Sequence, residues 1–75
     1  MLYNKLKDNE STIKELTMLG LVNPVWLRNI EVFECYQYQI DKGHGVYDAF
    51  MIVSEEIRPR LSWQSVKKIV YNLSK

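Results

Sequence analysis

Cysteine and histidine are almost missing from this chain. Cys35 is its only cysteine and His44 is its only histidine. A single cysteine excludes an intramolecular disulfide and a cysteine-based zinc site. We therefore expect Cys35 to be a small helix residue and His44, which stands between two glycines, to be a polar residue of a tight turn. No metal or other cofactor is predicted.

Long apolar runs are also missing. The longest uninterrupted run covers residues 49–53, whereas a helix needs about 20 apolar residues to span a bilayer. Residues 1–8 lack the apolar segment of a signal peptide. Together with the lone thiol, these absences predict a soluble, cytoplasmic protein with no membrane partner.

Catalytic motifs are absent as well. The sequence contains no Gly-rich phosphate loop and no HExxH motif. It also has no pair of carboxylates in a sequence context that is typical of catalysis. Its 75 residues form one domain, 1–75, with little room for a deep cleft. The composition, 47% apolar and 25% charged, is nevertheless typical of a folded chain. We therefore expect a globular protein that is not an enzyme.

Caps and apolar spacing predict four helices, of which the first covers residues 12–19. Thr12 and Glu15 have the spacing of a capping box, and Ser11 is an equally good cap. Gly20 is expected to end this helix. Residues 1–10 carry no comparable signal, and we expect them to be flexible.

The second predicted helix covers residues 24–42. Asn23 caps its start, Pro24 suits the first helical position, and Gly43 ends it. One stripe at helical spacing comprises Trp26, Ile30, Phe33, Gln37 and Ile40. Further apolar residues lie off this stripe, namely Val25, Leu27, Val32 and Tyr36. Such a wide apolar arc indicates either that several helices pack around this one or that part of it contacts another subunit.

Two further helices are predicted at 46–57 and 63–73. The first of them stops before Pro59, and the second begins after Ser62, which is a good cap. Their apolar faces comprise Val46, Ala49, Phe50, Val53 and Ile57, and then Val66, Ile69, Val70 and Leu73. No segment alternates with a period of two, so the predicted fold class is all-α, a small bundle of about four helices.

The last two predicted helices and their turn resemble a helix-turn-helix DNA-binding unit. That family has an apolar and then a small residue in the first helix, an apolar residue at its end, another in the turn, and two buried apolar residues in the second helix. The corresponding positions here are Val53 with Ser54, Ile57, Leu61, and Val66 with Ile69. The matched segment, residues 46–73, is similar to small regulators of phages and mobile elements. The resemblance therefore implies a transcriptional regulator that binds double-stranded DNA.

The turn departs from the family pattern. Arg58-Pro59-Arg60 lengthens it by about two residues before Leu61. Because the match depends on common apolar spacings, the alternative is a structural helical hairpin within a small bundle.

Charge favours the DNA-binding interpretation. Residues 1–57 contain nine acids and five bases, a net charge of −4, whereas residues 58–75 contain five bases and no acid, a net charge of +5. The overall +1 is therefore a cancellation. The excess positive charge lies on the turn and the last helix, as a nucleic-acid interface requires.

The candidate DNA-binding residues all belong to this basic segment. They are Arg58, Arg60, Ser62, Trp63, Gln64, Ser65, Lys67, Lys68 and Tyr71. Gln64 is the best candidate for reading a base, because its amide can pair bidentately with adenine. The two lysines are expected to contact guanine or phosphate, the arginines to clamp phosphates, and the serines to donate to the DNA backbone. Trp63 and Tyr71 are each expected to touch a thymine methyl or a sugar, with a lid over the core as the alternative for Trp63.

Contacts with proteins are predicted too. Because a single small unit makes few DNA contacts, we expect a homodimer through the helix at 24–42 together with Met51 and Ile52. The rival function is a protein-interaction module that binds and modulates a host or phage protein without contacting DNA. Its acidic surface for a basic partner would comprise Glu31, Glu34, Asp41, Asp48, Glu55 and Glu56.

Overall fold

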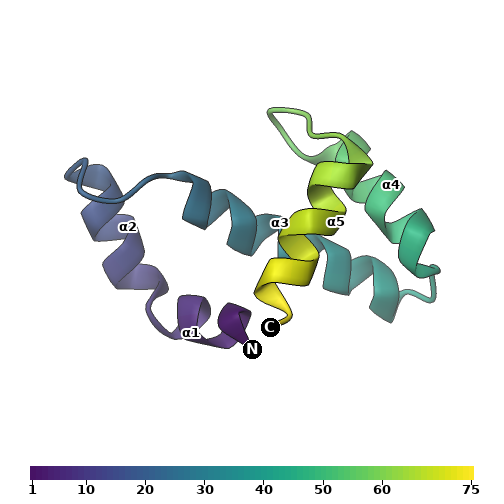
Figure 1. Cartoon of the computed structure of the whole chain (residues 1–75), viewed down its shortest axis with the longest axis horizontal. Helices are drawn as coiled ribbons and strands as arrows, with labels where there is room; N and C mark the ends of the chain where they lie inside the picture. Colours follow the sequence, from purple (N-terminus) through teal and green to yellow (C-terminus); the bar gives the residue numbers. More distant parts are fainter.

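A computed structural model describes residues 1–75 as five helices without strands. The helices are α1 (Leu2–Asp8), α2 (Glu10–Met18), α3 (Val25–Asp41), α4 (Val46–Glu56) and α5 (Trp63–Leu73). The all-α fold class is confirmed, with one helix more than predicted. Helix α3 crosses the middle of the molecule, with α1 and α2 toward one end and α4 and α5 toward the other (Figure 1). It contacts each of the other four helices.

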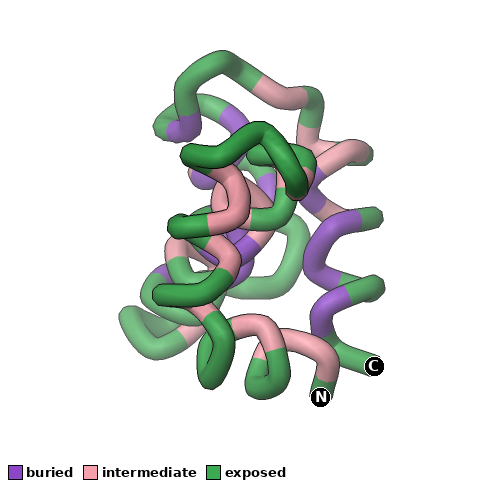
Figure 2. Tube along the Cα trace, turned by 90° about the vertical axis from the view of Figure 1, so that its left-hand side faces the viewer, coloured by how far each residue is buried: buried purple, intermediate pink, exposed green.

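The core lies where α3, α4 and α5 meet. One cluster of nine buried residues contains Val32, Phe33, Phe50, Val53, Ile57, Val66, Ile69, Val70 and Leu73. Buried positions follow one side of the last helix in Figure 2, whereas α1 and α2 contain no buried residue. The helices α4 and α5 therefore pack against α3 through the core, while α1 and α2 cover its edge.

Helices α3, α4 and α5 begin and end within one residue of their predicted bounds. Side-chain caps explain two of the starts, because the Oδ1 of Asn23 accepts from the N–H of Val25 at 2.9 Å and the Oγ of Ser62 accepts from the N–H of Ser65 at 3.2 Å. The predicted stop at Gly43 is confirmed as well, with a φ of 98° that favours glycine. The exposed His44 follows in this turn, where its N–H donates to the carbonyl of Gln39 at 3.2 Å.

Residues 2–8, which were expected to be flexible, form α1 instead. No side chain caps this helix, and its stabilisation comes from α3. The ring of Tyr3 stacks on Phe33 with centroids 4.6 Å apart, and its hydroxyl donates to Glu34 at 3.1 Å. The Nζ of Lys7 lies 3.3 Å from the same carboxylate. The segment is helical because of partners that are distant in the sequence, and local signals do not reveal them.

Helix α2 begins at Glu10 rather than at Thr12, so the predicted start is wrong. The capping box of Thr12 and Glu15 is not formed, because no side-chain hydrogen bond caps this helix. Asn9 joins α1 to α2 instead, with its Nδ2 donating to the carbonyl of Lys5 at 2.8 Å. The helix that precedes Asn9 therefore sets the start of α2. Its predicted end at a glycine is confirmed by the φ of 77° at Gly20.

The buried face of α3 differs from the predicted stripe. Gln37 is exposed and Trp26 is 38% exposed, whereas Val32 is fully buried. The reason is that helices pack on both flanks of α3, so its buried surface is an arc rather than one stripe. Of the two explanations for the wide apolar arc, packing by several helices is therefore the one that accounts for Val32. On α4, Val46 is 45% exposed, because the first turn lies at the edge of the bundle.

Removing the cap of α5 is expected to destabilise the domain. Ser62→Ala leaves the N–H of Ser65 without its acceptor and should lower the free energy of unfolding by about 1 kcal/mol. Ser11→Ala is the matched control, since Ser11 is exposed within α2 and caps nothing. Urea denaturation followed by circular dichroism measures both variants. Equal stabilities of the two variants would contradict the assigned cap.

Candidate nucleic-acid interface

The connection between α4 and α5, residues 57–62, is anchored at two apolar positions. Ile57 is 3% exposed, and Leu61 is half-buried against the core. Between these anchors the segment Arg58-Pro59-Arg60 is exposed, and its Arg58–Pro59 peptide bond is cis. Both arginines that were predicted to clamp phosphates therefore stand at the surface, just before α5 begins.

Arg58 is held in place by the end of α4. Its Nη1 donates to the carbonyl of Glu55 at 2.6 Å and to the carbonyl of Ile57 at 2.9 Å. These carbonyls belong to the last turn of the helix, which has no further helical partner for them. One guanidinium nitrogen is thus engaged by the backbone, and the others remain available to a ligand.

A polar stripe runs along the outward side of α5. Gln64, Lys68 and Tyr71 follow one another at helical spacing, opposite the buried residues of the same helix, and all three are exposed. The structure thus brings together three predicted residues, and Lys75 follows beyond the end of the helix. Ser62 and Ser65 lie at the start of the helix, where the hydroxyl of Ser62 donates to the Oγ of Ser65 at 3.0 Å. The hydroxyl hydrogen of Ser65 is the one that remains free for a ligand.

Lys67 does not share this stripe, because two tyrosines hold it at the boundary between α5 and α4. Its Nζ lies 5.5 Å from the ring centroid of Tyr71 and 5.7 Å from that of Tyr47. Trp63 is half-buried, packs against the core, and meets Tyr47 edge-on at 5.9 Å. Of the two roles predicted for Trp63, this arrangement favours a lid over the core rather than a contact with DNA. Tyr71 is 53% exposed and remains accessible.

Sequence reasoning did not identify Tyr47. It stands in the first turn of α4, off the apolar stripe, and is 59% exposed. Its ring contacts Phe50 and Trp63 edge-on, at 5.9 Å in each case. These contacts depend on how α4 lies against α5, so no local pattern in the sequence indicates them. Tyr47 extends the candidate interface from α5 onto α4.

The contacts of Lys67 with the tyrosines predict a stabilising role that Lys68 lacks. Lys67→Met removes two cation–π contacts and should lower the free energy of unfolding by about 1 kcal/mol, which shifts the melting temperature by about 4–8 °C in a domain of this size. Lys68→Met is the control, and a change within about 0.5 kcal/mol is expected there. Thermal denaturation measures both. Equal melting temperatures would show that the rings do not hold the ammonium.

The bases of residues 58–75 are not neutralised within the chain. The three ion pairs of the structure all join Lys7 or Lys14 to Glu10 or Glu34, in the first three helices. Arg58, Arg60, Lys67, Lys68 and Lys75 pair with no carboxylate. Their positive field is therefore directed to solvent, where an anionic ligand can meet it.

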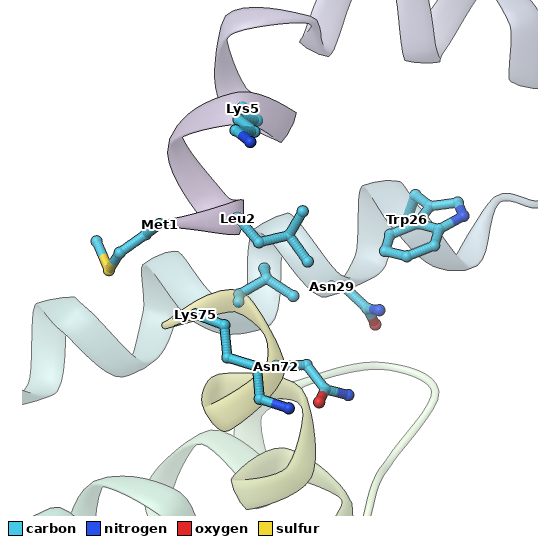
Figure 3. A pocket seen from close by; sticks show the side chains of 8 residues that line it. Met1, Leu2, Lys5, Trp26, Asn29, Asn72 and Lys75 are labelled. Atoms are coloured by element: carbon cyan, nitrogen blue, oxygen red, sulfur yellow. The ribbon is translucent and has the colours of Figure 1, made fainter.

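A separate hollow lies at the other end of α5, between α1, α3 and α5 (Figure 3). It has a volume of about 490 Å³, and Lys5, Trp26, Asn29 and Asn72 are among its lining residues. None of the predicted DNA-binding residues lines it, whereas Lys75, which follows α5, does. This hollow is therefore not part of the basic surface around residues 58–68.

The remaining candidates for chemistry lie apart from this surface. Burial raises the pKa of the Cys35 thiol, and the nearby carboxylates of Glu31, Glu56 and Glu34 raise it further. The thiolate that a nucleophile needs is thereby disfavoured. No group of three or more His, Cys, Asp or Glu side chains is placed to hold a metal ion. None of the helices combines the length and the apolar character that crossing a membrane requires.

Comparisons with protein-family models, with curated proteins and with solved structures found no match to this chain.

Proposed function

We propose that the protein binds double-stranded DNA through α5 and the connection that precedes it. The observation that carries this proposal is the set of five unpaired bases in residues 58–75, a segment that contains no acid. Phosphate contacts from lysine and arginine supply most of the affinity of such proteins for DNA. The proposal extends to transcriptional regulation of the phage and mobile-element kind, which the resemblance of residues 46–73 implies.

In this proposal α4, the connection and α5 act as a helix-turn-helix, and α5 enters the major groove. Gln64 and Lys68 lie on the outward stripe in the first half of α5, where they meet the base edges. Arg60 and Lys75 contact phosphates on either side. Lys67 contributes its charge from a fixed position between Tyr47 and Tyr71.

Mapping the contacted residues by NMR tests the proposal. Titration of the ¹⁵N-labelled protein with a short random-sequence duplex is expected to shift the backbone amides of residues 58–71 first, in a saturable way. The amides of α2 serve as the internal control, because that helix lies at the other end of the molecule (Figure 1). Shifts confined to α1 and α2, or no shifts at low salt, would contradict DNA binding through α5.

A homodimer is part of the same proposal, because paired units read two half-sites about one DNA turn apart. Val32 and Tyr36 of α3 pack within the chain, so the predicted contact consists of the exposed residues of α3, among them Trp26 and Tyr38, together with Met51 and Ile52. Met51 is 53% exposed and Ile52 is half-buried. Sedimentation velocity of the wild type and of Met51→Glu tests this contact, and a monomer in both cases would contradict it.

The second candidate is the protein-interaction module, and the α2–α3 connection favours it. Met18, Leu19 and Leu21 are 88%, 67% and 71% exposed, which is a cluster of large apolar side chains in water. Five of the six acidic residues named for this function make no ion pair, whereas Glu34 is engaged by Lys7. A chain that shows no DNA-induced shifts at low salt would favour this candidate.

A further inference from the structure

We infer that Arg28 and Arg58 together hold a phosphate of the DNA backbone in a groove between the start of α3 and the connection 57–62. The inference rests on the proposed function and adds a contact outside α5. The groove has a volume of about 520 Å³ and is lined by both arginines, with Asn23 and Pro59 beside them. Glu31 is the only acid that lines it, and it pairs with neither arginine.

The groove presents hydrogen-bond donors that lack acceptors. The Nε of Arg28 is buried and has no hydrogen-bond partner within the chain. Only the Nη1 of Arg58 is engaged, by the carbonyls of Glu55 and Ile57. The amide of Asn23 uses its Oδ1 to accept from the N–H of Val25, so its NH₂ remains free. A phosphate in the groove offers several acceptor oxygens and negative charge to the terminal guanidinium nitrogens of both arginines and to the NH₂ of Asn23.

The donors that matter here are side chains rather than the end of α3. The first-turn amides of α3 already donate to Asn23 and to the carbonyl of Pro24. Two guanidinium groups in one groove repel each other. An anion between them relieves this repulsion, and no carboxylate of the chain pairs with either arginine.

The position of the groove selects DNA as the source of the phosphate. The connection between α4 and α5 carries Arg58 on the groove and then Arg60 and the start of α5 (Figure 1). If the bases of a DNA strand contact the outward stripe of α5, the phosphate backbone of that strand runs along the connection 57–62 and reaches the start of α3. Arg28, which belongs to the acidic segment by sequence, joins the basic surface in space.

Salt-dependent DNA binding by charge-removing variants tests the inference. Arg28→Gln and Arg58→Gln keep much of each stem, and Arg28→Lys keeps the charge. The binding constant for a random duplex falls with salt, and the slope of log K against log salt loses about 0.9 for each phosphate contact removed. Because the two arginines share one phosphate, each Gln variant should bind up to about fivefold more weakly at about 0.15 M salt, with a slope smaller by up to about 0.9, whereas Arg28→Lys should retain the wild-type slope.

The outcomes separate this inference from the proposed function. Lys42→Gln is the control, because Lys42 lies at the end of α3 above the ring of Tyr38 and away from the groove. Circular dichroism and the melting temperature confirm that each variant is folded. If the wild type binds and Arg28→Gln keeps its slope, the phosphate contact of Arg28 is wrong while DNA binding through α5 stands. If the wild type does not bind DNA at all, the proposed function fails.

Discussion

Phe50→Ala is expected to lower the free energy of unfolding by about 3–5 kcal/mol, the largest effect of any single substitution considered for this chain. Phe50 is fully buried, and its ring contacts three tyrosines: Tyr36 at 5.3 Å, Tyr47 at 5.9 Å and Tyr71 at 6.4 Å. Truncation leaves a cavity where α3, α4 and α5 meet. A domain of this length has a total stability of roughly 4–11 kcal/mol, so the substitution removes between about a quarter and all of it.

Urea denaturation followed by far-ultraviolet circular dichroism measures this loss. Glu56→Ala is the matched control on the same helix, because Glu56 is exposed and forms no ion pair, and it should change stability by no more than about 0.5 kcal/mol. Phe50→Leu keeps most of the apolar volume and should fall between the two. A stability of Phe50→Ala within about 1 kcal/mol of the wild type would mean that the core does not lie at the junction of these helices.

Reversing two charges, one in the connection before α5 and one in the middle of α5, is expected to abolish most DNA binding. Arg60→Glu with Lys68→Glu removes two phosphate or base contacts and places two carboxylates opposite the DNA backbone. The loss of two contacts alone weakens binding about 30-fold at about 0.15 M salt, and the added repulsion increases this further. Both side chains are exposed and neither forms an ion pair, so the helical content should be unchanged.

The matched control for this double variant is Lys14→Glu with Lys42→Glu. It changes the net charge by the same amount, but in the middle of α2 and at the end of α3, outside residues 58–75. Fluorescence anisotropy with a labelled duplex compares the two proteins. Equal losses of affinity would show that DNA responds to the total charge of the protein, and the assigned interface would then be wrong.

The second half of the chain could be predicted well because its signals are local. Ser62 caps α5 by accepting from the N–H of Ser65, three residues further along the chain. The apolar residues of α4 and of α5 each repeat at helical spacing on one face of their helix. The partners of such interactions lie within about one helical turn of each other in the sequence, so a local pattern reveals them. The outward stripe of α5 follows from the same periodicity, which is why Gln64 and Lys68 were identified together.

The remaining features depend on contacts between distant segments. Helix α1 forms because Tyr3 stacks on Phe33 and Lys7 meets Glu34, and neither contact has a local signature. Lys67 is equivalent to Lys68 in a helical pattern, yet the position of α4 places Tyr47 beside it. A charge sum along the chain likewise places Arg28 among acids, whereas the fold places it beside the basic connection.

Binding of the wild-type protein to a random-sequence duplex over a series of salt concentrations tests DNA recognition most directly. Anisotropy is measured from about 0.05 M to about 0.5 M salt, and log K is plotted against log salt. Four to five phosphate contacts predict a straight line with a slope of about −3.6 to −4.5. No binding at the lowest salt concentration, or an affinity that does not change with salt, would contradict the account.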